Sequence, residues 1–572
     1  MRPVNDRLRL LTRHTLQIAS LGALLAVLFG RSLGEHMRRA TEPLLFNDDA
    51  RQQIFEFYRN VDPDLFPHDT IGDYYLASFP LGYRALYAWL APLVDPSVLS
   101  KVVPYILLAV TGLGVVLAAR ELGGLSAALG SAAMLLSTGI FFDRMVGGLP
   151  RSFAFPLLAL ALFALVAGRA YMLALLVVVA ALFYPPAGAL CGIALAILLI
   201  AVPARDRGCA SSWSLPRRFL VLTATAVAAV LMLVPPVVSL RSYGRTLTPS
   251  DAATFPELGP GGRYGPDDRP PFPDLVTAAI VPARRALVGA GEPILPPARA
   301  WTQARGAAHV ADVMLAVLLA GLLALCVEAG RGRRAVVLGL AVALGYVAAR
   351  LVPPFFYLPQ RYVAYAVPVA VLTLLPAGGA ALAGLIFRRR AMHVGRPLGA
   401  ILVALCCLVA LGGRGTTSAG FTVDARPGKR LYAFLSSLPK DVLVAGFPGG
   451  PVDNVPYVAR RTALLTYETH QAFHEKYALE MRRRMRIFVA AYFASDPHDL
   501  TRLRDELGVT HLIVDAAHFT RRPGYIKPLD DDVRVAYEKG RRAGFALQTL
   551  LPSAVFSEAN LAVIDLSRVG AR

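Results

Sequence analysis

Long apolar segments recur along most of this chain and limit the folds that it can adopt. A helix crosses a bilayer with about 20 consecutive apolar residues, and about eleven segments come near that length. They are residues 15–32, 102–119, 125–142, 152–168, 170–184, 187–203, 218–240, 309–327, 334–352, 362–387 and 397–413. Hydrophobic residues make up 55% of the chain and charged residues 17%, whereas soluble domains carry about 25% charged residues. We therefore expect a polytopic α-helical membrane protein.

One further segment, 74–94, determines the predicted topology. It carries Arg84 near its centre, and such a charge costs about 2.5–3.5 kcal/mol in a lone spanning helix. Because tyrosines and a tryptophan also run along it, we predict that it lies in the outer membrane interface. With the N-terminus inside, the later arginine clusters then fall in the cytoplasm, where basic loops are favoured. Residues 33–101, 241–308 and all after 414 fall outside.

The charge pattern also bears on partners and location. The net charge of +20 comes mostly from arginines clustered between apolar runs, which is typical of membrane topology, so no nucleic-acid partner is expected. The first apolar segment follows Arg2, Arg7, Arg9 and Arg13 without a convincing cleavage site. It is typical of an uncleaved signal anchor. Membrane lipid is thus a predicted partner, and the location is a cell membrane crossed many times.

The composition changes to that of a soluble domain near the end of the chain. We predict a membrane domain over 1–413 and a small α/β domain over 414–572, outside the membrane. Helices alternate there with short apolar runs, which indicates a three-layer domain with a mainly parallel sheet. The predicted helices are 431–438, 471–494 and 498–507, and the predicted strands are 442–445, 463–466 and 510–514. His470 and His474 would lie four residues apart on one helix, a spacing that suits a metal or an exposed helical face.

The stretch Phe46-Asn47-Asp48-Asp49-Ala50-Arg51-Gln52 stands out in the predicted outer loop. Residues 50–61 have the pattern of an interfacial amphipathic helix. Asp49 and Gln52 would then form a capping box, and both carboxylates would favour the positive end of the helix. A cap needs only one of the two acids, however. The sequence leaves open whether they cap a helix or act as catalytic acids.

These features resemble the C-type (GT-C) glycosyltransferase superfamily, whose membrane enzymes share a signal anchor and an acidic pair in a large outer loop. The chain is most similar to bacterial relatives of the protein O-mannosyltransferase and lipid A aminoarabinose transferase families. Residues 1–413 match by architecture, and Asn47-Asp48-Asp49-Ala50-Arg51 is the sharpest motif. It has Asp-Asp where several relatives have Asp-Glu, and the Trp-Trp-Asp motif of oligosaccharyltransferases is absent.

The resemblance implies an inverting transferase that moves a sugar from a polyprenyl-phosphate carrier. The acceptor would be a glycan, lipid or protein at the outer face of a bacterial cytoplasmic (inner) membrane. Asp48 or Asp49 would accept the proton of the acceptor hydroxyl. Sugar and acceptor are not specified by the sequence, and a divalent cation is left open as a cofactor.

The departing phosphate needs cationic hydrogen-bond donors, for which arginine is well suited. The outer-face candidates are Arg51, Lys101, Arg144, Arg151, Arg350 and Arg361. Arg361 could instead anchor its helix at the interface. Asp143 is a candidate second acid or a partner of Arg144, and His68, Asp69 and Asp73 are candidates to support an acceptor or a metal.

Two other classes of protein fit parts of the sequence. A catalytically silent GT-C-like assembly protein would use the membrane segments as a scaffold for its outer domain. A transporter of lipid-linked glycans would carry charged residues near the bilayer midplane. Because almost every charge lies at the end of an apolar segment, we favour the transferase.

Overall fold

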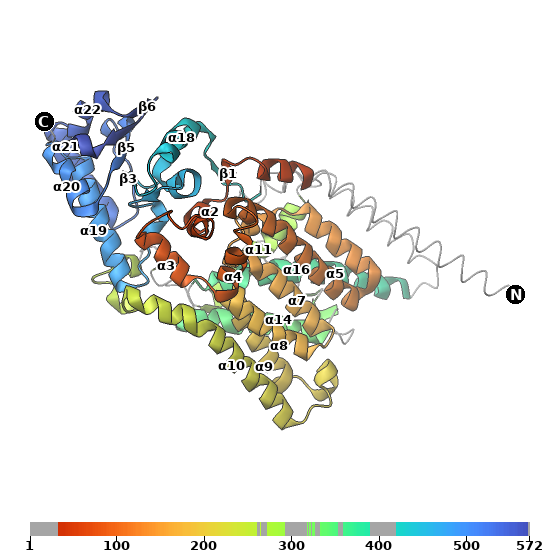
Figure 1. Cartoon of the computed structure of the whole chain (residues 1–572). Helices are drawn as coiled ribbons and strands as arrows, with labels where there is room; N and C mark the ends of the chain where they lie inside the picture. Colours follow the sequence, from red (N-terminus) through yellow and green to blue (C-terminus); the bar gives the residue numbers. More distant parts are fainter. Residues whose placement is uncertain are drawn as a thin grey trace.

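A computed structural model describes residues 33–259, 264, 271–291, 317, 320–321, 323–325, 332–352, 358–388 and 419–569. Helices fill most of the described part before residue 388 (Figure 1), and several of them are long and apolar. The predicted segments 15–32 and 397–413, and most of 309–327, lie outside the described residues. The chain is a multi-pass membrane protein, and the number of spans stays a prediction.

Four described helical stretches are long and apolar enough to cross a membrane: Pro96–Leu136, Leu215–Tyr243, Gly332–Leu351 and Gln360–Leu382. The first belongs to α5 (Pro96–Ser137), which joins two predicted segments through a kink at Gly124, where φ is 74°. The other three contain α10 (Leu215–Leu240), α14 (Gly332–Leu351), and α15 (Gln360–Ala364) with α16 (Ala366–Arg388). Shorter apolar helices are α7 (Ala154–Val166), α8 (Ala170–Phe183) and α9 (Pro185–Ala196). Helix α11 (Pro271–Gly291) packs against α14 and α16.

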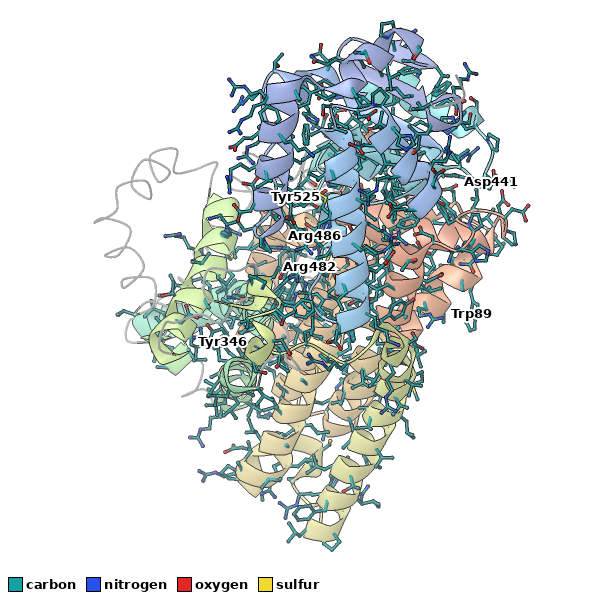
Figure 2. All side chains as sticks on the ribbon, turned by 90° about the vertical axis from the view of Figure 1, so that its left-hand side faces the viewer. Trp89, Tyr346, Asp441, Arg482, Arg486 and Tyr525 are labelled. Carbon is teal, nitrogen blue, oxygen red and sulfur yellow. The ribbon has the colours of Figure 1, made fainter. Side chains whose placement is uncertain are left out.

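Residues 74–94 form two short helices, α3 (Thr70–Ser78) and α4 (Leu81–Leu90). The chain turns between them at Phe79 and Pro80, because proline cannot continue a helix in its interior. Trp89 is 79% exposed on α4, and Figure 2 shows it at the side of the molecule. Neither helix has the length of a membrane span.

The region after residue 419 contains a five-stranded sheet in the order β4-β3-β5-β7-β6. The predicted strands appear as β3 (Leu443–Gly446), β4 (Thr462–Ala463) and β5 (His511–Asp515), and β3 pairs parallel with both neighbours. The sequence missed β6 (Phe556–Glu558) and β7 (Leu561–Asp565), which pair antiparallel. The sheet is therefore mixed, and the prediction of a mainly parallel sheet was wrong.

The same region contains four longer helices: α18 (Lys429–Ser437), α19 (Glu475–Tyr492), α20 (His498–Leu507) and α21 (Leu529–Ala543). Because α19 begins at Glu475, the predicted helical pair of His470 and His474 was wrong. His470 ends a short 3₁₀ turn, and His474 precedes α19. His474 Nδ1 instead lies 2.9 Å from the Tyr74 hydroxyl.

A small antiparallel pairing connects the acidic loop to the C-terminal region. Strand β1 (Leu45–Phe46) pairs with β2 (Val423–Asp424), with Phe46 opposite Val423. The acidic pair follows directly after β1. The C-terminal region therefore contacts the N-terminal part of the chain immediately before the two acids.

Candidate functional site

The two aspartates occupy the first turn of α2 (Asp48–Gln53), and Asn47 is the residue that caps this helix. Asn47 Oδ1 accepts a hydrogen bond from the Asp49 amide (3.1 Å), and its Nδ2 donates to the Gly420 carbonyl (3.0 Å). The predicted Asp49–Gln52 capping box was therefore wrong. Since Asn47 supplies the cap, both carboxylates point elsewhere.

The predicted amphipathic helix over 50–61 also differs. Helix α2 ends at Gln53, and a 3₁₀ helix, η1 (Phe55–Asn60), continues the chain. Phe57 and Tyr58, placed on the lipid-facing side by the sequence, are each 1% exposed inside the protein. They pack on other aromatic rings, Phe57 stacking on Tyr87 at 4.6 Å between ring centroids. This segment is buried structure that holds α2.

Asp48 is paired with Arg51 one helical turn later. Arg51 Nη2 lies 2.6 Å from Asp48 Oδ1 and 3.3 Å from Asp453 Oδ2, and its Nη1 donates to Asn454 Oδ1 at 2.7 Å. The Asp48 side chain is 48% exposed, whereas that of Arg51 is 14% exposed. One guanidinium group is thus shared between an open carboxylate and a sealed one.

Asp49 is paired with Arg151 from a different loop. Arg151 belongs to η2 (Pro150–Phe153); its Nη1 forms an ion pair with Asp49 Oδ2, and its Nη2 lies 3.3 Å from Asn47 Oδ1. The preceding Gly148 has φ 58°, and a Cβ there would lie 2.6 Å from the Tyr87 hydroxyl. Only glycine allows both this backbone conformation and this close approach. The loop geometry therefore delivers Arg151 to the acid.

The C-terminal region supplies residues that the sequence missed. Asp453 and Asn454 lie in the short helix η10 (Pro451–Asn454), which packs on α2. The Asp453 carboxylate accepts hydrogen bonds from the amides of Gly449 (3.2 Å) and Tyr467 (3.0 Å). Burial raises the pKa of Asp453 to about 6. Its place just after the carboxyl end of a strand was the available signal, because ligands often bind there in open sheets.

We call Asp48, Asp49, Arg51, Arg151 and Asp453 the Asp48 cluster. Two guanidinium groups meet three carboxylates in it, so the cluster carries one net negative charge when all are ionised. Arg51 and Arg151, predicted to bind phosphate, here bind the acids. Within the described residues, the Nε of each arginine is buried without a hydrogen-bond acceptor.

The other predicted residues lie outside this cluster. Lys101 Nζ donates to the Glu42 carbonyl at 2.6 Å and is buried. Arg361 is the second residue of α15 and interacts electrostatically with Tyr184. Arg350 forms a buried ion pair with Asp274 at 2.7 Å.

Asp143, the candidate second acid, does not contact Asp48 or Asp49 directly and is connected to their helix through Gly420. Its Oδ1 accepts a hydrogen bond from the Gly420 amide at 3.1 Å, and the Gly420 carbonyl accepts from Asn47. Burial raises the pKa of Asp143, while the nearby Arg144 charge opposes the shift. Asp143 therefore supports the cap of α2 through Gly420.

His68, Asp69 and Asp73 do not gather into a ligand set. Asp69 is buried and caps α3, accepting from the Ile71 amide at 3.0 Å. Asp73 pairs with Arg59 at 2.5 Å, and His68 is exposed with φ 56°. In the part of the chain that the structure describes, no three His, Cys, Asp or Glu side chains could hold a metal ion. These residues do not fit a divalent cation, and no step below uses one.

No family model matches the chain, and no curated protein matches it. Solved structures do. The oligosaccharyltransferase of Archaeoglobus fulgidus tethered to an acceptor peptide is 14% identical, with 91% of this chain and 72% of that one covered, at a TM-score of 0.49. ArnT from Cupriavidus metallidurans in the apo state is 16% identical, with 96% and 98% covered and a TM-score of 0.44. The structure of ArnT bound to undecaprenyl phosphate is 14% identical, with 96% of this chain and 98% of that one covered, at a TM-score of 0.41.

Both of these neighbours belong to the GT-C superfamily, and the second is a lipid A aminoarabinose transferase.

Proposed function

We propose that the protein is an integral-membrane glycosyltransferase that moves a sugar from a polyprenyl-phosphate carrier to an acceptor hydroxyl at the outer face of a bacterial inner membrane. The N-terminus lies inside, and residues 414–572 form an outer domain over the membrane domain 1–413. The carrier and the location follow the resemblance of residues 1–413 to GT-C enzymes. The acceptor is a glycan, lipid or protein.

One observation carries the proposal. Two adjacent, partly exposed carboxylates begin α2, and each forms an ion pair with an arginine, one from α2 and one from the loop before α7. One ion pair would be enough to hold the start of α2 in place, so two adjacent pairs suggest a further role. Acids and guanidinium groups side by side are what the transfer needs, because a base must take a proton while a phosphate leaves.

We assign the base to Asp48. Its side chain is more exposed than that of Asp49, at 48% against 30%. Its guanidinium partner is also shared with Asp453, so the Asp48 carboxylate is held less tightly than that of Asp49 and is freer to meet the acceptor hydroxyl.

The reaction then balances simply. The acceptor oxygen attacks the anomeric carbon, its proton passes to Asp48, and the bond from that carbon to the phosphate oxygen breaks with its electron pair on the polyprenyl phosphate. Arg151 and Arg51 lie beside the acids, and their positive charges stabilise the charge that develops on the leaving phosphate in the transition state. The configuration at the anomeric carbon inverts.

Transfer of radiolabelled sugar from polyprenyl-phosphate donors in membranes tests the proposal. Membranes would carry equal amounts of the unsubstituted chain, Asp48→Asn, Asp49→Asn or the control Asp441→Asn, whose side chain is exposed in the C-terminal region (Figure 2). We expect transfer by the unsubstituted chain and the control, and a loss of about 10²–10⁴-fold in Asp48→Asn. Full transfer by both site variants would exclude the base, and no transfer from any donor by the unsubstituted chain would refute the function.

A further inference from the structure

The buried Asp453 of the C-terminal region reaches the candidate catalytic acids through Arg51. Asp453 lies beside Arg51, which in turn lies beside Asp48, at N···O distances of 3.3 Å and 2.6 Å. The side chain of Asp453 has 0% exposure. A carboxylate sealed from water is costly unless it is paired and hydrogen-bonded, so its place here needs a reason.

The surroundings of Asp453 fix its position on the protein side. Gly449, which has φ 88°, donates its amide to both carboxylate oxygens at 3.2 Å, and the Tyr467 amide donates at 3.0 Å. Asn454, the next residue, accepts from Arg51 at 2.7 Å and donates to the Tyr432 hydroxyl at 2.8 Å. The guanidinium group of Arg51 is therefore held at two points by η10.

We propose that Asp453 is a positioning residue that acts through Arg51: it holds the guanidinium group between two carboxylates and so keeps the Asp48 carboxylate available to the acceptor hydroxyl. The outer domain is then part of the active site. This inference rests on the function proposed above for Asp48.

The electrostatic argument is direct. When Asp453 is ionised, Arg51 divides its attraction between Asp453 and Asp48. When Asp453 is neutral, Arg51 attracts Asp48 alone, and the undivided cation competes more strongly with the acceptor hydroxyl for that carboxylate. Loss of the Asp453 charge should therefore slow proton transfer and leave donor binding unchanged.

The pH profile gives a readout that a merely structural role would not move. The groups that face Asp453 are Arg51 and Asp48 from α2 and Tyr432 from α18. Burial raises the pKa of Asp453 to about 6, so its charge is lost between about pH 7 and 5. We expect an acid limb in kcat over this range in the unsubstituted chain and a smaller one in Asp453→Asn.

A double-mutant cycle in transfer tests the route through Arg51. Asp453→Asn should lower kcat about three- to tenfold at pH 7.5 with KM for the donor unchanged, and Asp453→Glu should recover part of the loss. In an Arg51→Gln background, Asp453→Asn should have no further effect, because the group it acts through is gone. Asp441→Asn should change neither constant.

The four chains of the cycle are the unsubstituted chain, Asp453→Asn, Arg51→Gln and the double variant. Their Tm values in detergent measure the coupling between the two residues independently of transfer. A coupling in both Tm and kcat supports the positioning role. Effects on kcat that add, or an unchanged pH profile in Asp453→Asn, would overturn it while the transferase function stands. Thermal coupling without any transfer by the unsubstituted chain would instead refute the proposed function and this role with it.

Discussion

Two groups of acidic side chains follow the first strand within thirty residues of each other, and they differ in exposure. In the Asp48 cluster, Asp48 and Asp49 are 48% and 30% exposed. In the second group, which we call the Glu56 cluster (Glu56, Arg59, Asp69 and Asp73), Glu56 and Asp69 are each 2% exposed. Both contain arginine and several acids. The adjacent pair Asp48 and Asp49 can meet a substrate, whereas Glu56 and Asp69 are sealed between η1 and α3 and only Asp73 of the second cluster is open, at 48%.

The burial of the Glu56 cluster has a structural cause. Burial raises the pKa of Glu56 well above its usual value, with the Asp69 charge adding to the shift and Arg59 opposing it. Arg59 Nη1 lies 3.3 Å from Glu56 Oε2 and 2.5 Å from Asp73 Oδ1, so it ties η1 to α3. Acidic residues close together in the sequence thus form two different structures, and only the Asp48 cluster presents two adjacent exposed carboxylates.

The largest effect should distinguish activity from stability. Asp48→Asn should lower transfer about 10²–10⁴-fold while the free energy of unfolding stays within about 0.5 kcal/mol, since the side chain lies half in water. Transfer assays and thermal melts of the same preparation measure both. A lowered Tm together with unaltered transfer per folded molecule would reverse the comparison between the clusters.

Asp69 should affect stability through pH. Burial raises its pKa to about 6 from the usual 3.8, so the folded state binds the proton more tightly than the unfolded state. Its stabilising effect is complete below about pH 3.8 and is lost as pH rises through about 6. Two pKa units correspond to at most about 3 kcal/mol. Asp69→Asn keeps an N-cap side chain and should remove this pH dependence.

Tm measured from pH 4 to 7.5 for the two chains checks the prediction. The difference, unsubstituted minus Asp69→Asn, should fall as pH rises, and transfer at pH 7.5 should be little changed. Parallel Tm curves would show that Asp69 does not titrate in this range.

A smaller effect should come from the tight packing of Glu56 on α3. A Cβ added at Gly72 would overlap the Glu56 carboxylate, which has no room to move away because Glu56 is buried. Gly72→Ala should therefore destabilise the protein by about 1–3 kcal/mol. Gly34→Ala is the matched control, because nothing lies within 4 Å of a Cβ there. Equal Tm values for the two variants would contradict the close packing of this cluster.

The sequence could predict which residues matter near α2 but not how they meet. Asp48 and Asp49 were visible because they are adjacent and follow an apolar segment, and Arg151 because it precedes another. Their contact depends on a glycine turn at Gly148 and on the cap from Asn47, which only three-dimensional packing reveals. Asp453 and Asn454 were missed because they are distant in sequence: Arg51 and Asn454 are separated by 403 positions.

The same limit applies to the fold. Apolar length predicted α5, α7, α8, α10 and α14 well, since burial in a membrane depends on composition. The prediction of an interfacial helix over 50–61 failed because period alone cannot tell a lipid-facing surface from a protein-facing one. Strand β6 was missed because a three-residue edge strand carries little apolar signal, whereas β7 is an apolar run inside the sheet that the prediction overlooked.

The smallest effect concerns His68, which the sequence grouped with Asp69 and Asp73. It is exposed, and its φ of 56° lies in the left-handed region. His68→Gly removes the strain of a Cβ there but adds freedom to the unfolded chain, and these terms are each about 1 kcal/mol and opposite in sign. We expect a near-zero change in Tm.

His68→Ala separates the backbone from the imidazole, because it keeps the Cβ and removes the ring. If His68 only closes the turn before α3, His68→Ala should be no more stable than His68→Gly, and both should transfer sugar at the unsubstituted rate. Equal losses of transfer in the two variants, without loss of Tm, would mean that the ring reaches the acceptor. Such a result would extend the active site from the Asp48 cluster to the loop beside the Glu56 cluster. The exposed side chains of Asp48, Asp49 and His68 would then line one path for the acceptor.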